Sequence, residues 1–184
     1  MPRPAWGRFM TRQLFVMFVS AIVLTLSAPA PAAAQISDEA LGEKAITIVR
    51  AYSQLGIFDD VTVSVADRAI MLSGEVTTGL KREELGARIA KIDGARSVTN
   101  NIQVLPTSTT DGNLRIRLAQ AIYTHPAFWG YAAMACPPIH IIVANGYVRL
   151  TGVVNNEVER TLAYALAQIS GVQSVKNELR VDLR

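Results

Sequence analysis

Hydrophobic and polar residues alternate in two short segments that lie 78 positions apart. Valine occupies every second position from Val61 to Val65, and isoleucine or valine does so from Ile139 to Val143. A period of two is typical of a half-buried β-strand. Each segment is followed by a tight turn and a second alternating run. We therefore expect one β-hairpin in each half of the chain.

The two expected turns differ in sequence. Asn145-Gly146 is a strong hairpin signal, because a type I′ turn needs two residues that tolerate positive φ. Asp67-Arg68 is a weaker version of the same turn. The return strands end at Gly74 and Gly152, and glycine inside a strand indicates a bulge or a close backbone approach.

Apolar residues with helical spacing precede and follow each hairpin. The predicted helical stripes lie within residues 41–52, 85–92, 114–122 and 162–169. Intervals of three and four residues place such side chains on one helix face. Asn156 with Glu159 is typical of a capping-box helix start. Gly94 and Gly171 are expected to end the second helix of each half, since positive φ costs glycine little.

The two halves repeat each other in sequence. IAKIDGARSVTNNIQV (residues 89–104) and LAQISGVQSVKNELRV (residues 166–181) agree at seven of 16 positions. A long-period repeat indicates a duplicated structural unit. We expect an α+β protein of two tandem small αββαβ units, each a three-stranded mixed sheet with two helices on one face. The expected bounds are 38–105 and 111–184, with a linker at 106–110.

The repeated V-x-L-x-G-x-V segment, the helix after it and G-V-x-x-V-x-N-x-L-x-V resemble the BON domain, the bacterial osmotically induced and nodulation domain. NGYVRLTGVV (residues 145–154) and GVQSVKNELRV (residues 171–181) fit best, whereas Asp67-Arg68-Ala69 and Ala95 depart from the pattern. The resemblance implies an exported tandem-domain protein linked to envelope or osmotic stress that binds phospholipid membranes or other macromolecules.

The N-terminus has the pattern of a secretory signal peptide. Three arginines precede an apolar run from Leu14 to Ala28, and small residues stand at Ala32 and Ala34. We expect residues 1–34 to be removed by cleavage before Gln35, which implies a periplasmic protein; the alternative is an uncleaved anchor. The chain has 18 basic and 15 acidic residues. Since the surplus is these three arginines, no steering toward nucleic acid is expected.

No catalytic, metal or cofactor constellation is evident. His125, His140 and Cys136 supply three metal-binding side chains without the close paired spacing of zinc sites. His140 is expected to face away from the core of its strand. Cys136 is the only cysteine, so no internal disulfide can form. We expect a buried thiol, although the following Pro137-Pro138 leaves exposure open.

A long aromatic connection distinguishes the second unit. Phe128, Trp129 and Tyr131 lie in YTHPAFWGYAAMACPP (residues 123–138), where the first unit has only a short loop. These aromatic residues suit a protein interface or contact with lipid headgroups. The alternative, which we favour, is a lid over a small core or a helix extension that packs on the other unit.

Two basic residues are expected on the second helix of the first unit, and a third just beyond it. Arg88, Lys91 and Arg96 are candidate contacts for anionic lipid, but interleaved acidic residues favour a solvated face. From these features we expect a non-enzymatic envelope protein that binds a phospholipid surface or an envelope protein. The alternative is an assembly module of an envelope or secretion complex without lipid binding. The oligomeric state stays open.

Overall fold

The computed structural model describes residues 36–182, and this part of the chain contains two αββαβ units in succession. The α+β class and the tandem arrangement predicted from the repeat are therefore confirmed. The predicted signal peptide, residues 1–34, lies outside the described residues.

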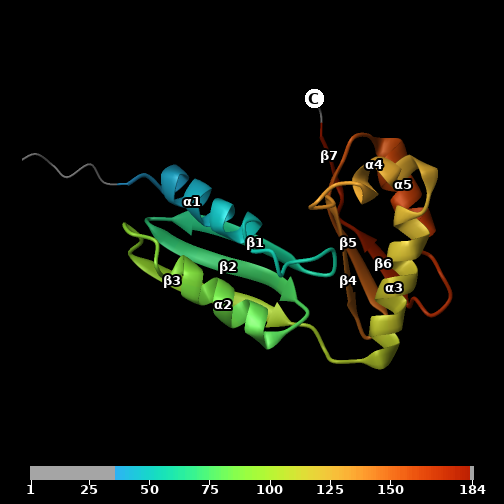
Figure 1. Ribbon diagram of the computed structural model, residues 1–184, viewed down its shortest axis with the longest axis horizontal. Coiled ribbons are helices and arrows are strands. Elements are labelled where there is room, and N and C mark those ends of the chain that lie inside the picture. Colours follow the sequence, from blue (N-terminus) through green and yellow to red (C-terminus); the bar gives the residue numbers. More distant parts are fainter. Residues whose placement is uncertain (1–35, 183–184) are drawn as a thin grey trace, which may run out of the picture. The chain divides into compact units, whose positions relative to one another are not determined.

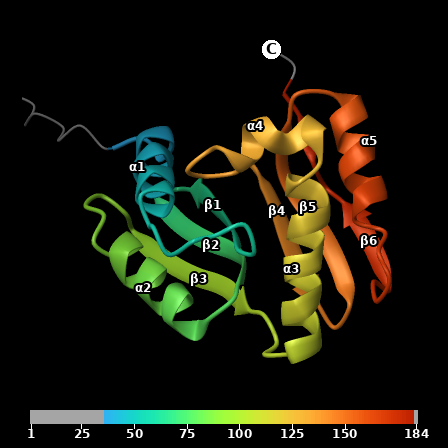
Figure 2. The same ribbon diagram turned by 45° about the vertical axis from the view of Figure 1, so that its right-hand side comes forward.

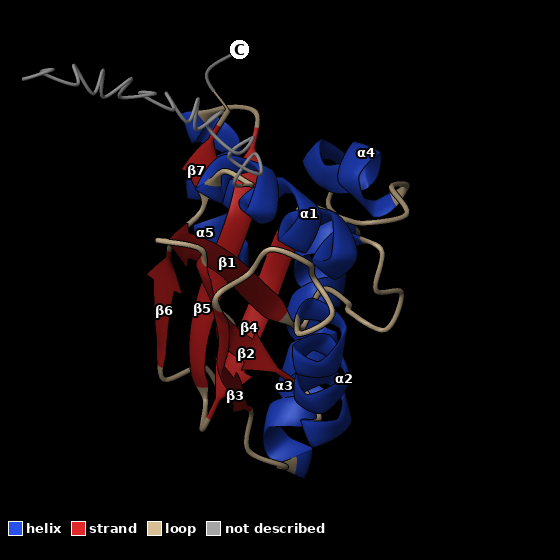
Figure 3. Ribbon diagram, turned by 90° about the vertical axis from the view of Figure 1, so that its left-hand side faces the viewer, coloured by secondary structure: helices blue, strands red, loops and turns tan. Residues whose placement is uncertain are grey.

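The first unit forms one mixed sheet under two helices. Its elements are α1 (Asp38–Arg50), β1 (Asp60–Ala66), β2 (Ala69–Val76), α2 (Gly79–Ile89) and β3 (Ser97–Val104). β1 pairs antiparallel with β2, and β3 pairs parallel with the other edge of β2. Both helices lie over the same face of this sheet, as Figures 1 and 3 show.

The second unit repeats this plan with additions. Its elements are α3 (Thr109–Tyr123), the 3-10 turn η1 (Pro126–Phe128), α4 (Trp129–Ala132), β4 (Ile139–Ala144), β5 (Tyr147–Val154), α5 (Glu157–Leu166), β6 (Ser174–Asn177) and β7 (Arg180–Val181). Figure 2 shows the short α4 beside the end of α3. Because α3 begins at Thr109, with Ser108 as its N-cap, the helix includes the last two residues of the expected linker.

The third strand of the second unit is split, whereas the sequence predicted one continuous strand. β6 and β7 both pair parallel with β5, and the break falls between them. The Asn177 side-chain oxygen accepts the Leu179 N–H at 3.2 Å, and its amide donates to the Arg160 carbonyl at 2.9 Å. Asn100 makes the same two contacts in the first unit, with Ile102 and Arg82. This motif asparagine therefore ties the last strand to the crossover helix, a structural role.

Each unit has its own apolar core. The buried residues of the first are Leu41, Ala45, Val49, Tyr52, Ile70, Leu72, Val76, Leu85, Ile89, Ile92 and Ile102. Those of the second are Leu114, Leu118, Ile122, Phe128, Tyr131, Ile139, Ile141, Val143, Val148, Leu150, Val154, Ala163, Ala167 and Leu179. Ala163 of α5 and its C-cap Ala167 are fully buried, whereas Leu162 and Leu166 of the predicted stripe are half-buried. Small side chains at these two positions let the helix approach the sheet closely.

Two glycine predictions have different outcomes. A Cβ at Gly74 would lie 2.1 Å from the Asp60 carbonyl oxygen, and one at Gly152 would lie 1.8 Å from that of Pro138, which confirms a close approach. Gly94 and Gly171 do not end their helices. Ala90 and Ala167 are the C-caps, and each glycine lies four residues further on, with φ of 94° and 96°. The turn after each helix, not its cap, requires positive φ.

Candidate binding surfaces

The three aromatic residues of the long connection have separate roles. Phe128 is fully buried and Tyr131 is 7% exposed, so both belong to the second core. Their rings stack with centroids 5.9 Å apart. Trp129 is 61% exposed. The lid alternative is therefore correct for Phe128 and Tyr131, and only Trp129 presents a ring to solvent.

A hydrogen-bond network joins this connection to the start of α5. The Tyr131 hydroxyl donates to Glu159 at 2.5 Å and accepts the Asn155 N–H at 3.0 Å. Burial and the bond to Glu159 raise the pKa of Tyr131 to about 12. Burial opposes ionisation of Glu159, but hydrogen bonds from Tyr131, Asn155 and Asn156 hold the pKa of its carboxyl below the usual value. The predicted N-cap is confirmed, since the Glu159 N–H donates to the Asn156 side chain; the Glu159 carboxylate in turn accepts the N–H of Asn155 and not that of Asn156, so the capping box is formed in part.

The chain segment around Trp129 contains no charged residue. The sequence has no Asp, Glu, Lys or Arg between Arg117 and Arg149. We call residues 124–136 the Trp129 segment. Met134 is 49% exposed there, and Cys136 is exposed, so the expectation of a buried thiol was wrong. The connection continues past its short helix before β4, and this leaves Cys136 outside the core.

The Trp129 indole N–H is already satisfied within the chain. It donates to the Thr124 carbonyl at 2.9 Å, at the C-cap of α3. The exposed ring can therefore leave water without stranding an unpaired N–H, which would otherwise be costly. This contact and the buried neighbours Phe128 and Tyr131 hold Trp129 in a defined outward position.

The three predicted basic residues do not line one common pocket among the two described. Arg88 lies over the Tyr52 ring, 5.0 Å from its centroid, in an open pocket that also contains Lys81 and Glu84. Arg96 lines a different pocket, and exposed Lys91 lines neither of these two. Neither of these two pockets therefore brings Arg88, Lys91 and Arg96 together as a binding site for anionic lipid.

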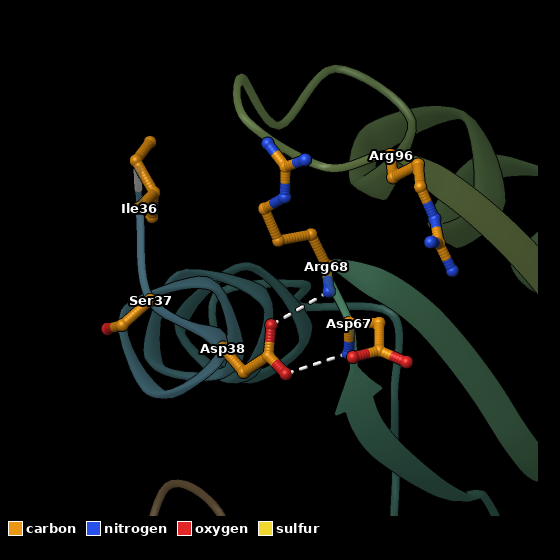
Figure 4. A pocket seen from close by; sticks show the side chains of 6 residues that line it. All are labelled: Ile36, Ser37, Asp38, Asp67, Arg68 and Arg96. Atoms are coloured by element: carbon orange, nitrogen blue, oxygen red, sulfur yellow. Dashed lines mark hydrogen bonds between the residues drawn. The ribbon is translucent and has the colours of Figure 1, made fainter. Parts of the chain in front are cut away.

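An open, mostly polar pocket surrounds the hairpin turn of the first unit (Figure 4). Its volume is about 610 Å³, and we call it the tip pocket; its lining residues are Ile36, Ser37, Asp38, Asp67, Arg68 and Arg96. The Asp38 carboxylate accepts the N–H groups of Asp67 and Arg68, each at 2.8 Å. Sequence reasoning did not identify Asp38 or Arg68 as important.

The second unit has the same helix-to-turn contact. The Asp111 carboxylate accepts the N–H groups of Asn145 and Gly146 at 2.8 and 2.9 Å. Asp111 is 1% exposed. The shared signal was an aspartate in the first turn of the leading helix, at Asp38 and Asp111. These carboxylates pin a helix to a turn, which is a structural task.

Asp59 is also buried for a structural reason. It is 2% exposed and accepts hydrogen bonds from the Gly56 and Thr77 N–H groups, the Thr77 hydroxyl and Lys81. Its ion pair with Lys81 spans 2.7 Å. Because both oxygens are occupied, Asp59 is poorly suited to act as a general base.

Arg149 contacts carboxylates from both halves of the sequence. Its guanidinium binds Asp60 at 3.2 Å, Glu178 at 3.1 Å, and Glu75. Burial lowers the pKa of Arg149, but Glu178, Glu75 and Asp60 outweigh this effect and raise it. All its neighbours are carboxylates, so Arg149 is engaged in ion pairing.

The histidines and Cys136 do not assemble a site. The ring Nδ1 of His125 accepts the Ala127 N–H at 3.3 Å, which caps the 3-10 turn. His140 is half-buried on β4 beside core residues Ile139 and Ile141. Within residues 36–182, no group of three or more histidine, cysteine or acidic side chains is arranged to hold a metal ion.

Among the described helices, none is both long and apolar enough to cross a bilayer.

Comparison with protein families decides the relationship. The model of the BON domain matches residues 37–106 and 132–182, which is more than half of the chain. The chain belongs to the BON domain family. The first BON match begins at the N-cap of α1 and includes the whole first unit. The second begins in α4 and leaves out α3, which precedes the aromatic connection.

Comparison with solved structures gives only distant likenesses. One is CdsD, a structural protein of the type III secretion system of Chlamydia trachomatis, at 15% identity and a TM-score of 0.29, covering 77% of this chain and 92% of that one. Another is the C-terminal domain of CdsD, at 16% identity and a TM-score of 0.26, covering 74% and 96%. No curated protein matches the BON chain. At these identities and TM-scores, the function of CdsD cannot be assigned to this chain.

Proposed function

We propose that this BON protein is a non-enzymatic component of the cell envelope whose second unit contacts a phospholipid surface through the Trp129 segment. The observation that carries the proposal is the exposed ring of Trp129 on an uncharged segment. Tryptophan is enriched at the level of lipid headgroups, where its ring is buried and its polar edge is solvated. The envelope location rests on the family and on the predicted signal peptide.

The available contact energy is useful but modest. A tryptophan side chain buries about 150–250 Å² when fully covered. With 61% of it exposed, roughly 100–150 Å² can still leave water. At about 25 cal/mol per Å², that contributes up to about 4 kcal/mol before the cost of association. Such a contact supports reversible surface binding and not permanent insertion.

Vesicle co-sedimentation of the exported chain tests this proposal. Wild-type protein should sediment with phosphatidylcholine vesicles and with vesicles that also contain phosphatidylglycerol. Trp129→Ala should weaken partition by roughly 10- to 100-fold, since 1.4 kcal/mol corresponds to tenfold. Tyr147→Ala is the matched control, because Tyr147 is 58% exposed but lies on β5, outside the Trp129 segment.

Fluorescence supplies a second reading of the same contact. Trp129 is the only tryptophan after residue 34, so its emission should shift to shorter wavelength when vesicles are added. An unchanged spectrum, together with equal partition of Trp129→Ala and wild type, would refute the lipid contact. Loss of binding to an envelope protein on Trp129→Ala would then favour the assembly-module alternative. A role in osmotic or envelope stress stays a prediction from the family.

A further inference from the structure

The turn of the first unit places Asp67 and Arg68 in a left-handed conformation that the second unit fills with asparagine and glycine. Asp67 and Arg68 have φ of 50° and 59°, and the corresponding residues are Asn145 and Gly146 at 52° and 78°. A left-handed conformation costs an ordinary side chain about 1–2 kcal/mol, and glycine far less. Asp38 offsets this cost through its two hydrogen bonds. Strain retained in one copy is a reason to ask what Arg68 does there.

Arg68 stands beside a second arginine without a carboxylate partner. The Arg96 N–H donates to the Arg68 carbonyl at 2.7 Å, so the two side chains start from adjoining backbone in the tip pocket. Within residues 36–182 neither guanidinium forms an ion pair. Figure 4 shows the Arg68 side chain extending away from the carboxylates of Asp38 and Asp67.

The second unit has the same backbone without these charges. The Gln173 N–H donates to the Gly146 carbonyl at 2.8 Å, as Arg96 does to Arg68. Asn145, Gly146 and Gln173 thus replace Asp67, Arg68 and Arg96. The fold does not need the arginines, because the equivalent turn forms without them.

We propose that Arg68 and Arg96 form a binding site for a phosphate group at the hairpin tip of the first unit. A guanidinium presents paired N–H donors that match the oxygens of a phosphate, and charge-assisted bonds of this kind are strong. Each oxygen of the Asp38 carboxylate accepts one N–H of the turn, and within residues 36–182 neither Asp38 nor Asp67 forms an ion pair with these arginines. The site lies in the first unit and does not depend on the contact proposed for Trp129.

Titration of the ¹⁵N-labelled exported chain with sodium phosphate tests the site by NMR, with sodium chloride at equal ionic strength as reference. The backbone and side-chain N–H signals of Arg68 and Arg96 should shift and saturate with phosphate only. The triple variant Asp67→Asn, Arg68→Gly, Arg96→Gln copies the second unit. It should lose the response at least tenfold while remaining as stable as wild type, since glycine relieves the turn.

The reciprocal variant makes the test stringent. Asn145→Asp, Gly146→Arg and Gln173→Arg should install a phosphate response in the second unit. If wild type responds no more to phosphate than to chloride, or if the first triple variant responds equally, the site does not exist. Should the reciprocal variant fold poorly by circular dichroism, Arg96→Gln alone decides the question, with a loss of at least tenfold expected.

Vesicles distinguish the two sources of the phosphate group. With a confirmed NMR response, weaker sedimentation of the first triple variant with phosphatidylglycerol vesicles identifies a lipid headgroup. Equal sedimentation identifies a soluble phosphate compound. A sedimentation difference without an NMR response to phosphate reflects general charge attraction and overturns the proposed site.

Discussion

Replacing Asp111 by alanine should destabilise the second unit severely. The substitution leaves the N–H groups of Asn145 and Gly146 without an acceptor, at a carboxylate that is 1% exposed. A hydrogen bond to a charged group contributes about 1.5–3 kcal/mol, so two of them give about 3–6 kcal/mol. Whole domains are stable by only about 5–15 kcal/mol.

Asp38→Ala provides the matched comparison in the first unit. Its two bonds have similar lengths, but Asp38 is more exposed than Asp111. Water can replace part of what is lost, so we expect about 1–2 kcal/mol there. Asp111→Asn keeps one carbonyl oxygen and should retain about half of the stabilisation.

Urea unfolding followed by Trp129 fluorescence measures the effect, because this residue lies in the second unit. With a slope of about 1–3 kcal/mol per molar urea, Asp111→Ala should lower the midpoint by roughly 2 M. Asp38→Ala should move that fluorescence midpoint much less. A loss below about 1 kcal/mol for Asp111→Ala, or a loss no larger than for Asp38→Ala, would refute the argument from burial.

Three further outcomes are expected. Alanine at Gly74 or Gly152 should each cost more than about 3 kcal/mol in chemical denaturation, because the new Cβ meets a carbonyl oxygen in a strand that cannot yield; full stability would contradict the close approach. Tyr131→Phe should flatten the pH dependence of unfolding. Because the pKa of Glu159 is lowered in the folded protein, its carboxylate stabilises the fold above pH 4.5, and this contribution is lost as the pH falls. Because the pKa of Tyr131 is raised, its neutral hydroxyl stabilises the fold below pH 10, and this contribution is lost as the pH rises toward 12. An unchanged pH profile in Tyr131→Phe would contradict the network. Cys136 should react with a thiol reagent in the folded protein nearly as fast as in urea, whereas strong protection would contradict its exposure.

The architecture could be predicted because its signals are local and periodic. Alternating valines and isoleucines, the Asn145-Gly146 turn and the repeated crossover segment each specify an element by near neighbours. The duplication added weight, since each ambiguous segment had a second copy. Family membership follows from the same residues, which are mostly structural.

The surfaces could not be predicted equally well. The three aromatic residues were treated as one group, although Phe128 and Tyr131, three positions apart, can share a helix face that Trp129 does not. The burial of Asp111 had no such signal, because an aspartate in the first turn of a helix is common for reasons of helix polarity. Only the folded chain brings that carboxylate to a turn 34 residues away. Likewise Arg88 and Arg96 lie close together in the sequence, on either side of the end of α2, but they line separate pockets.

The pinned hairpin turns have a consequence for how the chain acquires its structure. Asp38 accepts a hydrogen bond from a turn residue 29 positions later, and Asp111 accepts one from a turn residue 34 positions later. In the first unit, β3 pairs with β2 at a separation of 28 positions. Closing a loop of about 30 residues costs roughly 3 kcal/mol of chain entropy. All of these contacts join residues of the same half, so each half can begin to fold before the other is complete.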